Sequence, residues 1–221
     1  SQRIIDVVIG AMADALPDKV IGAANGANSM AVFTGTHPET GEDYVYLETL
    51  GGGMGGRNDR DGKDGVQVHI TNTSNLPVEA IEMEYPLLVE SYGLIPDTGG
   101  AGKYRGGLGL RRVVRPLGHT CLFNGVGERF RTQPWGIFGA HEGASGSFHL
   151  ETDAGDRRQL EHKTGNMWLH ADERVIVDTP GAGGYGDPAE RDEAGLEEDV
   201  GSGKFSAGYM AKHYGKVAPG E

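Results

Sequence analysis

Apolar and polar residues alternate along several short stretches of the chain, a pattern typical of strands in antiparallel β-sheets. Turn-forming Gly, Pro and Asp residues separate these stretches at intervals of about 8–12 residues. The stretches are residues 30–33, 43–47, 66–70, 110–116, 120–124, 146–151, 167–170 and 174–178. Because the segment between the first two is rich in turn formers, those two stretches predict a β-hairpin with a long loop.

Apolar residues recur at helical spacing mainly near the two ends of the chain. Residues 4–16 predict a helix that stops before Pro17, because the residue before a proline is kept out of the α region. The packed face of this helix is expected to consist of Ile4, Ile5, Val8, Met12 and Ala15, with Asp6 and Asp14 off that face. Near the other end, residues 189–200 predict a charged helix and residues 206–213 a short amphipathic one.

Together these elements predict an α+β fold that is mainly antiparallel β with flanking helices and long Gly-rich loops. The chain contains 38 glycines in 221 residues, which is about 17% against an ordinary usage of about 7%. The glycines gather in residues 22–29, 51–65, 97–109 and 179–186, where irregular backbone is expected. Residues 1–221 are expected to form one continuous unit, because the sequence shows no internal repeats.

The glycine loops do not predict a nucleotide site. The pattern G-x-G-x-x-G occurs at residues 51–56 and 181–186, but this glycine content produces about one such match by chance, and neither match leads directly into a helix. Residues 99–104 resemble a P-loop, yet Tyr104 follows Lys103 where a hydroxyl ligand for Mg²⁺ is required.

Charge and cysteine content exclude several classes of partner. With 20 Lys and Arg against 32 Asp and Glu, the net charge is −12, so neither nucleic acid nor a membrane surface is an expected partner. The single cysteine, Cys121, excludes an intramolecular disulfide and a thiolate zinc cluster, and it lies in an alternating strand that favours a buried, inert thiol. These features favour a cytoplasmic protein.

Local charge varies along the chain. Residues 187–199 carry seven acidic residues and one Arg, which is typical of a solvated helix face. Residues 103–115 carry five cations and no acid. Lys103 and Arg105 lie in the Gly-rich loop at the start of that stretch, where backbone can approach a ligand closely.

A possible catalytic group lies in residues 69–84. His69 precedes Asn72 and the carboxylates Glu79 and Glu82, which would share a face if the segment is helical, whereas Glu82 and Glu84 would do so in a strand. Carboxylates near cationic loops can orient a polar substrate or act as a general base. The alternatives are a structural histidine and a surface charge pair. No H-E-x-x-H motif or histidine pair four residues apart supports a metal site.

Five further motifs follow one another along the chain. They are Glu48-Thr49 with glycines 51–56, residues 75–82 with Tyr85-Pro86-Leu87, residues 97–109, Pro134-Trp135-Gly136, and residues 179–188. In this order and spacing they resemble the hydantoinase B/oxoprolinase family. The resemblance covers the C-terminal part of a B-type subunit. Family members carry, in an N-terminal part, an Asn-Asp-Pro segment and a Gly-Thr-His-x-x-Asp motif that supplies metal ligands. Because this sequence lacks those motifs, the chain alone is expected to be inactive.

The resemblance implies ATP-dependent opening of a cyclic amide such as 5-oxoproline or a hydantoin. A hydantoinase A-type partner would bind ATP and Mg²⁺ and phosphorylate the amide oxygen, and the B-type subunit would complete hydrolysis. A divalent metal is expected in the N-terminal part of the B-type subunit, and no cofactor in this chain itself. Two alternatives are a subunit of a related ATP-dependent ketone carboxylase and a non-catalytic assembly module.

Seven residues are expected to face the site of such a complex. The carboxylates and the imidazole would position water or act as catalytic groups, and the cations with one amide would bind the activated small-molecule substrate. The catalytic candidates are Glu79, Glu82 and His69, and the substrate-binding candidates are Arg57, Asn72, Lys103 and Arg105.

Overall fold

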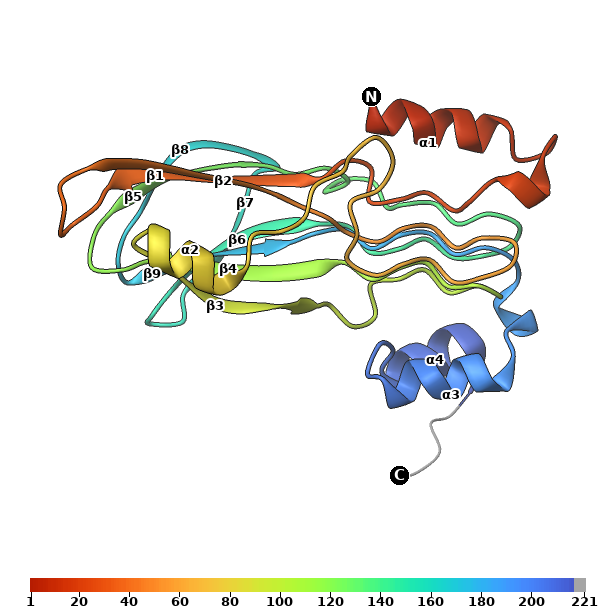
Figure 1. The fold of residues 1–221 in the computed structure, drawn as a ribbon. Coiled ribbons are helices and arrows are strands. Elements are labelled where there is room, and N and C mark those ends of the chain that lie inside the picture. Colours follow the sequence, from red (N-terminus) through yellow and green to blue (C-terminus); the bar gives the residue numbers. More distant parts are fainter. Residues whose placement is uncertain (217–221) are drawn as a thin grey trace.

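The structure is a computed structural model that describes residues 1–216 of the chain. Two antiparallel sheets lie face to face as a sandwich (Figure 1). The four-stranded sheet has the order β2 (Asp43–Leu50), β1 (Ser29–Thr36), β5 (Cys121–Val126) and β8 (Lys163–Leu169). The five-stranded sheet has the order β3 (Leu87–Leu94), β4 (Leu110–Pro116), β9 (Glu173–Asp178), β6 (Ser147–Thr152) and β7 (Arg157–Leu160). The expected α+β fold is confirmed.

The main core fills the space between the two sheets. Alternate residues of each strand point inward, so Phe33 and Phe123 from one sheet meet Phe148 from the other. Phe123 and Phe148 lie edge to face with ring centroids 6.1 Å apart. Cys121 is fully buried in this core, as its strand pattern predicted.

Most predicted strands are confirmed, and one is wrong. Residues 66–70 alternate in sequence, but only Val66 pairs, through an isolated bridge to Gly52. The alternation fails because His69 has a φ of +70°, which turns the backbone out of the extended region. Two strands, β3 and β7, were not predicted, since exposed and charged residues interrupt their patterns.

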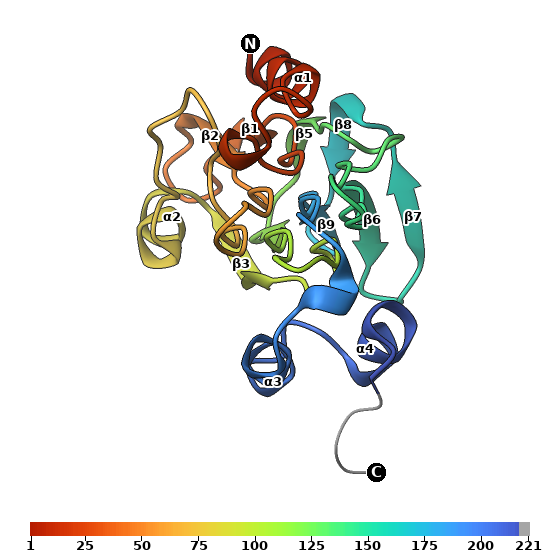
Figure 2. The ribbon, with the colours of Figure 1, turned by 90° about the vertical axis from the view of Figure 1, so that its right-hand side faces the viewer.

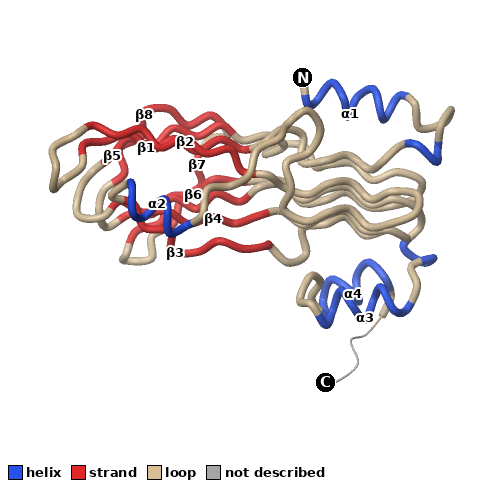
Figure 3. Tube along the Cα trace, in the orientation of Figure 1, coloured by secondary structure: helices blue, strands red, loops and turns tan. Residues whose placement is uncertain are grey.

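The glycine-rich segments run beside one another at one end of the sandwich, where Figure 3 shows them as parallel tan lines. We call this unit the glycine bundle, formed by residues 20–26, 51–65, 98–109, 134–144 and 179–186. Backbone hydrogen bonds join its segments, for example Gly53 N to Pro180 O at 3.0 Å and Gly183 N to Ala23 O at 2.9 Å. The bundle satisfies its buried backbone without forming helix or regular sheet.

Close backbone packing explains the glycine content of the bundle. A β-carbon at Gly106 would lie 1.9 Å from the carbonyl oxygen of Ala182, and one at Gly53 would lie 2.2 Å from that of Gly107. Because the obstacles are backbone atoms, no side chain can move aside to make room.

Four helices of the described residues lie outside the sandwich. They are α1 (Gln2–Ala11), α2 (Val78–Glu84), α3 (Glu193–Gly201) and α4 (Ala207–Tyr214). Side chains cap the last two, since Asp192 accepts from Gly195 N and Ser206 from Tyr209 N. Figure 2 shows α1 on the side of the four-stranded sheet and α3 and α4 on the opposite side. Among the residues described, no helix has the length and apolarity needed to cross a bilayer.

The packed face of α1 differs from the prediction. Ile4 and Val8, which were expected to pack, are 66% and 55% exposed, whereas Asp6 is buried. The reason is that the Asp6 carboxylate pairs with His69 and Arg129 and accepts from the backbone of Ala24, which turns its own face of the helix inward. The helix also ends at Ala11, and Pro17 begins a separate 3₁₀ turn, Pro17–Lys19.

Candidate functional site

The candidate site centres on a buried ionic group formed by His69, Asp6 and Arg129. His69 Nε2 lies 2.9 Å from Asp6 Oδ1, and Arg129 Nη2 donates to Asp6 Oδ2 over 2.8 Å. The backbone N–H of Ala24 also points at Asp6 Oδ1, at 3.4 Å. Helix α1 therefore supplies the carboxylate, and segments more than sixty residues away supply its two side-chain partners.

The geometry fixes the orientation and tautomer of His69. A carboxylate accepts hydrogen bonds but does not donate them, so Nε2 carries the proton that it shares with Asp6. In the neutral ring Nδ1 is then the acceptor, the form that can take up a proton as a general base. Both His69 and Arg129 have a positive φ, of +70° and +52° respectively. Such backbone strain in non-glycine residues concentrates at functional sites.

Two open depressions flank the segment that follows His69. One, of about 340 Å³, lies between this segment and the start of α1, and the other, of about 440 Å³, lies on its far side. Thr71 lines both, and its hydroxyl is buried with no hydrogen-bond partner among the described residues. The larger depression is lined mainly by amide and hydroxyl side chains, including Gln67, Asn72 and Asn75. Such groups suit a small polar molecule that both donates and accepts hydrogen bonds.

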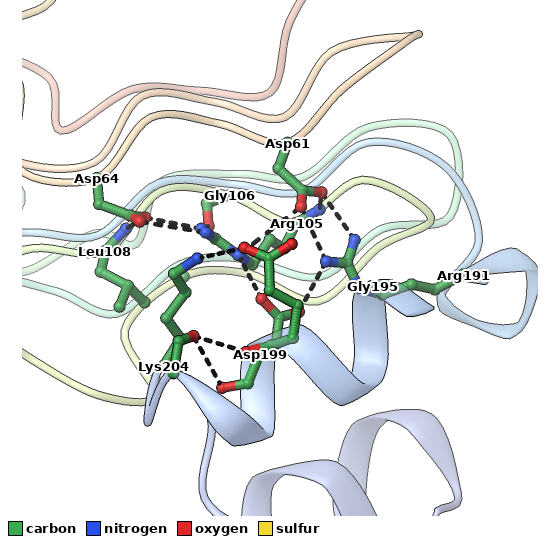
Figure 4. A network of polar contacts seen from close by, with 12 residues as sticks. Asp61, Asp64, Arg105, Gly106, Leu108, Arg191, Gly195, Asp199 and Lys204 are labelled. Carbon is green, nitrogen blue, oxygen red and sulfur yellow. Dashed lines mark hydrogen bonds and ion pairs between the residues drawn. The ribbon is translucent and has the colours of Figure 1, made fainter. Parts of the chain in front are cut away.

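Arg105 has a different environment, a buried network between the glycine bundle and α3 (Figure 4). Its Nε donates to Asp199 Oδ1 at 2.9 Å, and Nη1 and Nη2 donate to the two oxygens of Asp64 at 2.7 and 3.1 Å. Arg191 bridges Asp61 and Asp199 in the same network. The guanidinium of Arg105 thus donates its hydrogen bonds mainly to carboxylates, and the residue is 3% exposed.

The electrostatics of this network reflect burial and pairing together. Burial raises the pKa of the Asp199 carboxyl, although both arginines favour its charged form. At Asp61 burial is again the largest single effect, but the hydrogen bonds and positive charges of Arg191 and Arg105 together outweigh it and lower the pKa. Burial opposes the charged form of Arg105 as well, and the hydrogen bonds to Asp64 together with the charges of Asp64, Asp199 and Asp61 raise its pKa. Two cations and three carboxylates leave the network with one net negative charge.

The other predicted site residues are dispersed. Lys103 Nζ pairs with Glu190 at 3.0 Å, and Arg57 Nη2 donates to the sulfur of Met54 at 3.1 Å. Residues 78–84 are helical, so the carboxylates at 79 and 82 are one turn apart on exposed positions of α2.

Glu82 accepts from Val89 N at 3.0 Å. In the part of the chain that the structure describes, no hydrogen bond or ion pair links Glu79 or Glu82 to His69, Lys103 or Arg105. Of the predicted site residues, only Asn72 lines a depression, and the side chain of His69 lies buried three residues before it on the same segment.

Sequence reasoning missed the partners that orient the cluster. Asp6 lies in an apolar helix, where the pattern predicts a solvent-facing residue, and Arg129 is sixty residues beyond His69 with no motif around it. Likewise, no sequence pattern around Asp61, Asp64 and Asp199 indicated that these carboxylates pair with Arg105 and Arg191. Among residues 1–216, no group of three or more His, Cys, Asp and Glu side chains is arranged to hold a metal ion.

Comparison with known proteins identifies the family. Residues 1–188 match hydantoinase B/oxoprolinase. The chain belongs to the hydantoinase B/oxoprolinase family. An uncharacterized protein of Methanocaldococcus jannaschii is 42% identical over 206 residues, which cover 93% of this chain and 35% of that protein. The B-type subunit of a putative D-/L-hydantoinase from a Pseudomonas species is 31% identical, covering 96% of this chain and 35% of the relative.

A solved structure extends the likeness to the fold. The crystal structure of ATP-dependent caprolactamase from Pseudomonas jessenii matches with a TM-score of 0.85 at 27% identity. The match covers 95% of this chain and 38% of that one. The chain therefore spans little more than a third of the length of these members of the family.

Proposed function

We propose that this chain is the part of a B-type subunit that completes ATP-dependent hydrolysis of a cyclic amide in a hetero-oligomer. Family membership supports this, together with relatives named for hydantoin and caprolactam hydrolysis. In the proposed complex a hydantoinase A-type partner binds ATP and Mg²⁺ and phosphorylates the amide oxygen. The rest of the B-type subunit would hold a divalent metal.

The His69–Asp6–Arg129 cluster is the observation that carries the proposal for this chain. A phosphorylated lactam is a good electrophile, and its hydrolysis needs a group that takes the proton from the attacking water. His69, held by Asp6 with Nδ1 as acceptor, has the chemistry for that task. Asn72, on the same segment, would hydrogen-bond the amide or carboxylate of the substrate. Glu79 and Glu82 stay predictions as catalytic groups, and Arg57 stays a prediction for substrate binding.

The test uses the complete complex. Turnover would be followed as ring-opened amino acid and ADP formed from hydantoin, 5-oxoproline or caprolactam. His69→Gln is expected to lower kcat by about 100- to 10,000-fold, the usual contribution of general acid–base catalysis. Asp6→Asn, which loosens the hold on the ring, should also lower kcat. His37→Gln, in the exposed turn between β1 and β2, is the matched control and should leave turnover unchanged. Full activity of His69→Gln would refute the assignment.

A second candidate function, the non-catalytic assembly module, has its own support. The cations of the 97–109 loop, Lys103 and Arg105, are both engaged in ion pairs within the chain. That arrangement favours a role in holding the bundle to its C-terminal helices over substrate binding. Under this function His69→Gln would leave turnover intact, whereas Arg105→Met would reduce the amount of assembled complex. Bicarbonate-dependent ATP hydrolysis with a ketone would instead indicate the carboxylase alternative.

A further inference from the structure

The outer face of the four-stranded sheet is mainly apolar, and Val45, Leu47 and Trp168 on it are exposed. Its register places Val45, Thr34, Leu122 and Trp168 in one row across all four strands. A neighbouring row begins with Leu47, and the exposed fractions of Leu47 and Trp168 are 56% and 61%. We call this surface the apolar sheet face, defined by Met30, Val32, Thr34, Val45, Leu47, Leu122, Asn124, Val126 and Trp168. None of these nine residues is charged, and the charged residues of the same face, Asp43 and Lys163, lie at the ends of the edge strands.

The outer face of the five-stranded sheet provides an internal comparison. There Arg111 pairs with Asp178 on the neighbouring strand, and Arg174 pairs with Glu151, each at 2.7 Å. Gln159 continues the polar surface on the edge strand β7. Cross-strand ion pairs of this kind are typical of a sheet face in contact with water. The two faces of one sandwich thus differ in the way that a solvent-facing and a covered surface differ.

Helix α1 presents a second apolar surface. Five apolar residues are exposed on α1 or in the turn that follows it: Ile4, Val7, Val8, Met12 and Leu16. On the other side of the helix, Asp6 is buried against Arg129. Both views place α1 on the same side of the molecule as the four-stranded sheet (Figures 1 and 2). One side of the chain therefore carries two uncovered apolar surfaces, more than the scattered exposed residues normal for a monomer.

We propose that the apolar sheet face and the outer face of α1 are the docking surface for the remainder of the B-type subunit. The matched region is 35% of the putative hydantoinase relative and 38% of the caprolactamase chain, so in both a much larger part of the same polypeptide lies outside it. Because that part belongs to the same polypeptide in these relatives, it is always beside the matched region. A second copy of the region or a separate subunit need not be. A surface whose centre is apolar also suits permanent burial, because obligate interfaces resemble a domain core cut in half.

Site-specific photocrosslinking in the assembled complex tests the proposal. Benzoylphenylalanine would replace Leu47, Val7 or, as the control on the polar sheet, Gln159, and the crosslinked peptides would be mapped by mass spectrometry. We expect Leu47 and Val7 to capture peptides of the remainder of the B-type subunit, whether it is joined to this chain or separate, and Gln159 to capture none. Capture of a second copy of this chain, capture of the A-type partner, or no capture at Leu47 would each overturn the proposal.

Charge substitution gives an independent measurement. When the remainder of the subunit is supplied as a separate chain, Leu47→Glu combined with Val45→Glu is expected to weaken its co-elution with this chain at least tenfold, because a carboxylate would be buried without a partner. Gln159→Glu should co-elute like the unchanged protein. Unchanged co-elution of the double variant would overturn the proposal. Both measurements report binding and not turnover, so their failure is distinguishable from failure of the proposed hydrolase activity.

Discussion

Replacing Arg105 by Met tests the structural role of the buried network. Arg105 makes three hydrogen bonds to Asp64 and Asp199 and one to the carbonyl of Gly106. Methionine approximates the volume of the side chain but leaves Arg191 as the only cation for three carboxylates. Removing one partner of a buried ion pair costs about 3–5 kcal/mol, because the remaining charge stays desolvated without compensation. For a chain of this size that loss corresponds to a fall in Tm of about 6–20 °C.

The matched control is Arg111→Met. Arg111 also makes two hydrogen bonds to one carboxylate, that of Asp178, at 2.7 Å each, but its side chain is 42% exposed. An ion pair of that exposure contributes about 0.2–1 kcal/mol to stability. The two variants therefore remove the same side chain from similar pairs that differ in burial.

Urea unfolding, followed by circular dichroism at 222 nm, measures both variants. We expect Arg105→Met to lose several times more free energy of unfolding than Arg111→Met. The reasoning is refuted if the two losses are equal, or if Arg105→Met loses less than about 1 kcal/mol. Reduced turnover at unchanged stability would instead support the sequence-based prediction that Arg105 binds substrate.

Three further predictions concern the bundle, the core and a histidine. Gly106→Ala should destabilise the chain by about 3 kcal/mol or more, because its β-carbon would meet the Ala182 carbonyl, whereas Gly93→Ala, with open space around it, should change the free energy of unfolding by less than about 1 kcal/mol in a urea titration. Burial raises the pKa of Cys121 from 9.0 to about 11, so iodoacetamide at pH 8 should alkylate the folded chain about 100-fold more slowly than the unfolded chain; equal rates would show that the thiol is accessible. Burial, with a smaller contribution from Arg157, lowers the pKa of His149 below 6.5, so the unfolded chain binds this proton more tightly; stability should fall as pH drops through about 6.5, and His149→Gln should flatten that part of the Tm–pH curve.

The sequence determined the class of fold and the family. Alternation at β1, β2, β4, β5, β6, β8 and β9 was sufficient because each of these strands buries one face, so its hydrophobic period records its environment. The ordered glycine motifs identified the family. Backbone segments of the bundle pack so closely that a β-carbon does not fit, so these positions require glycine and their spacing can be recognised in the sequence. The strand predicted at residues 66–70 was wrong, because beyond Val66 this segment has no neighbouring strand to pair with.

Only the tertiary structure decided which polar residues act together. Asp6 and His69 are 63 residues apart, and Arg105 and Asp199 are 94 apart, and no local period connects such pairs. The same limit reversed the prediction for α1. Its apolar face turns outward because the Asp6 carboxylate is buried against His69 and Arg129, which lie far from it in the sequence. The periodicity of a strand or helix depends on neighbouring residues and can be read from the sequence. Ion pairing and burial depend on distant segments that meet only in the folded chain.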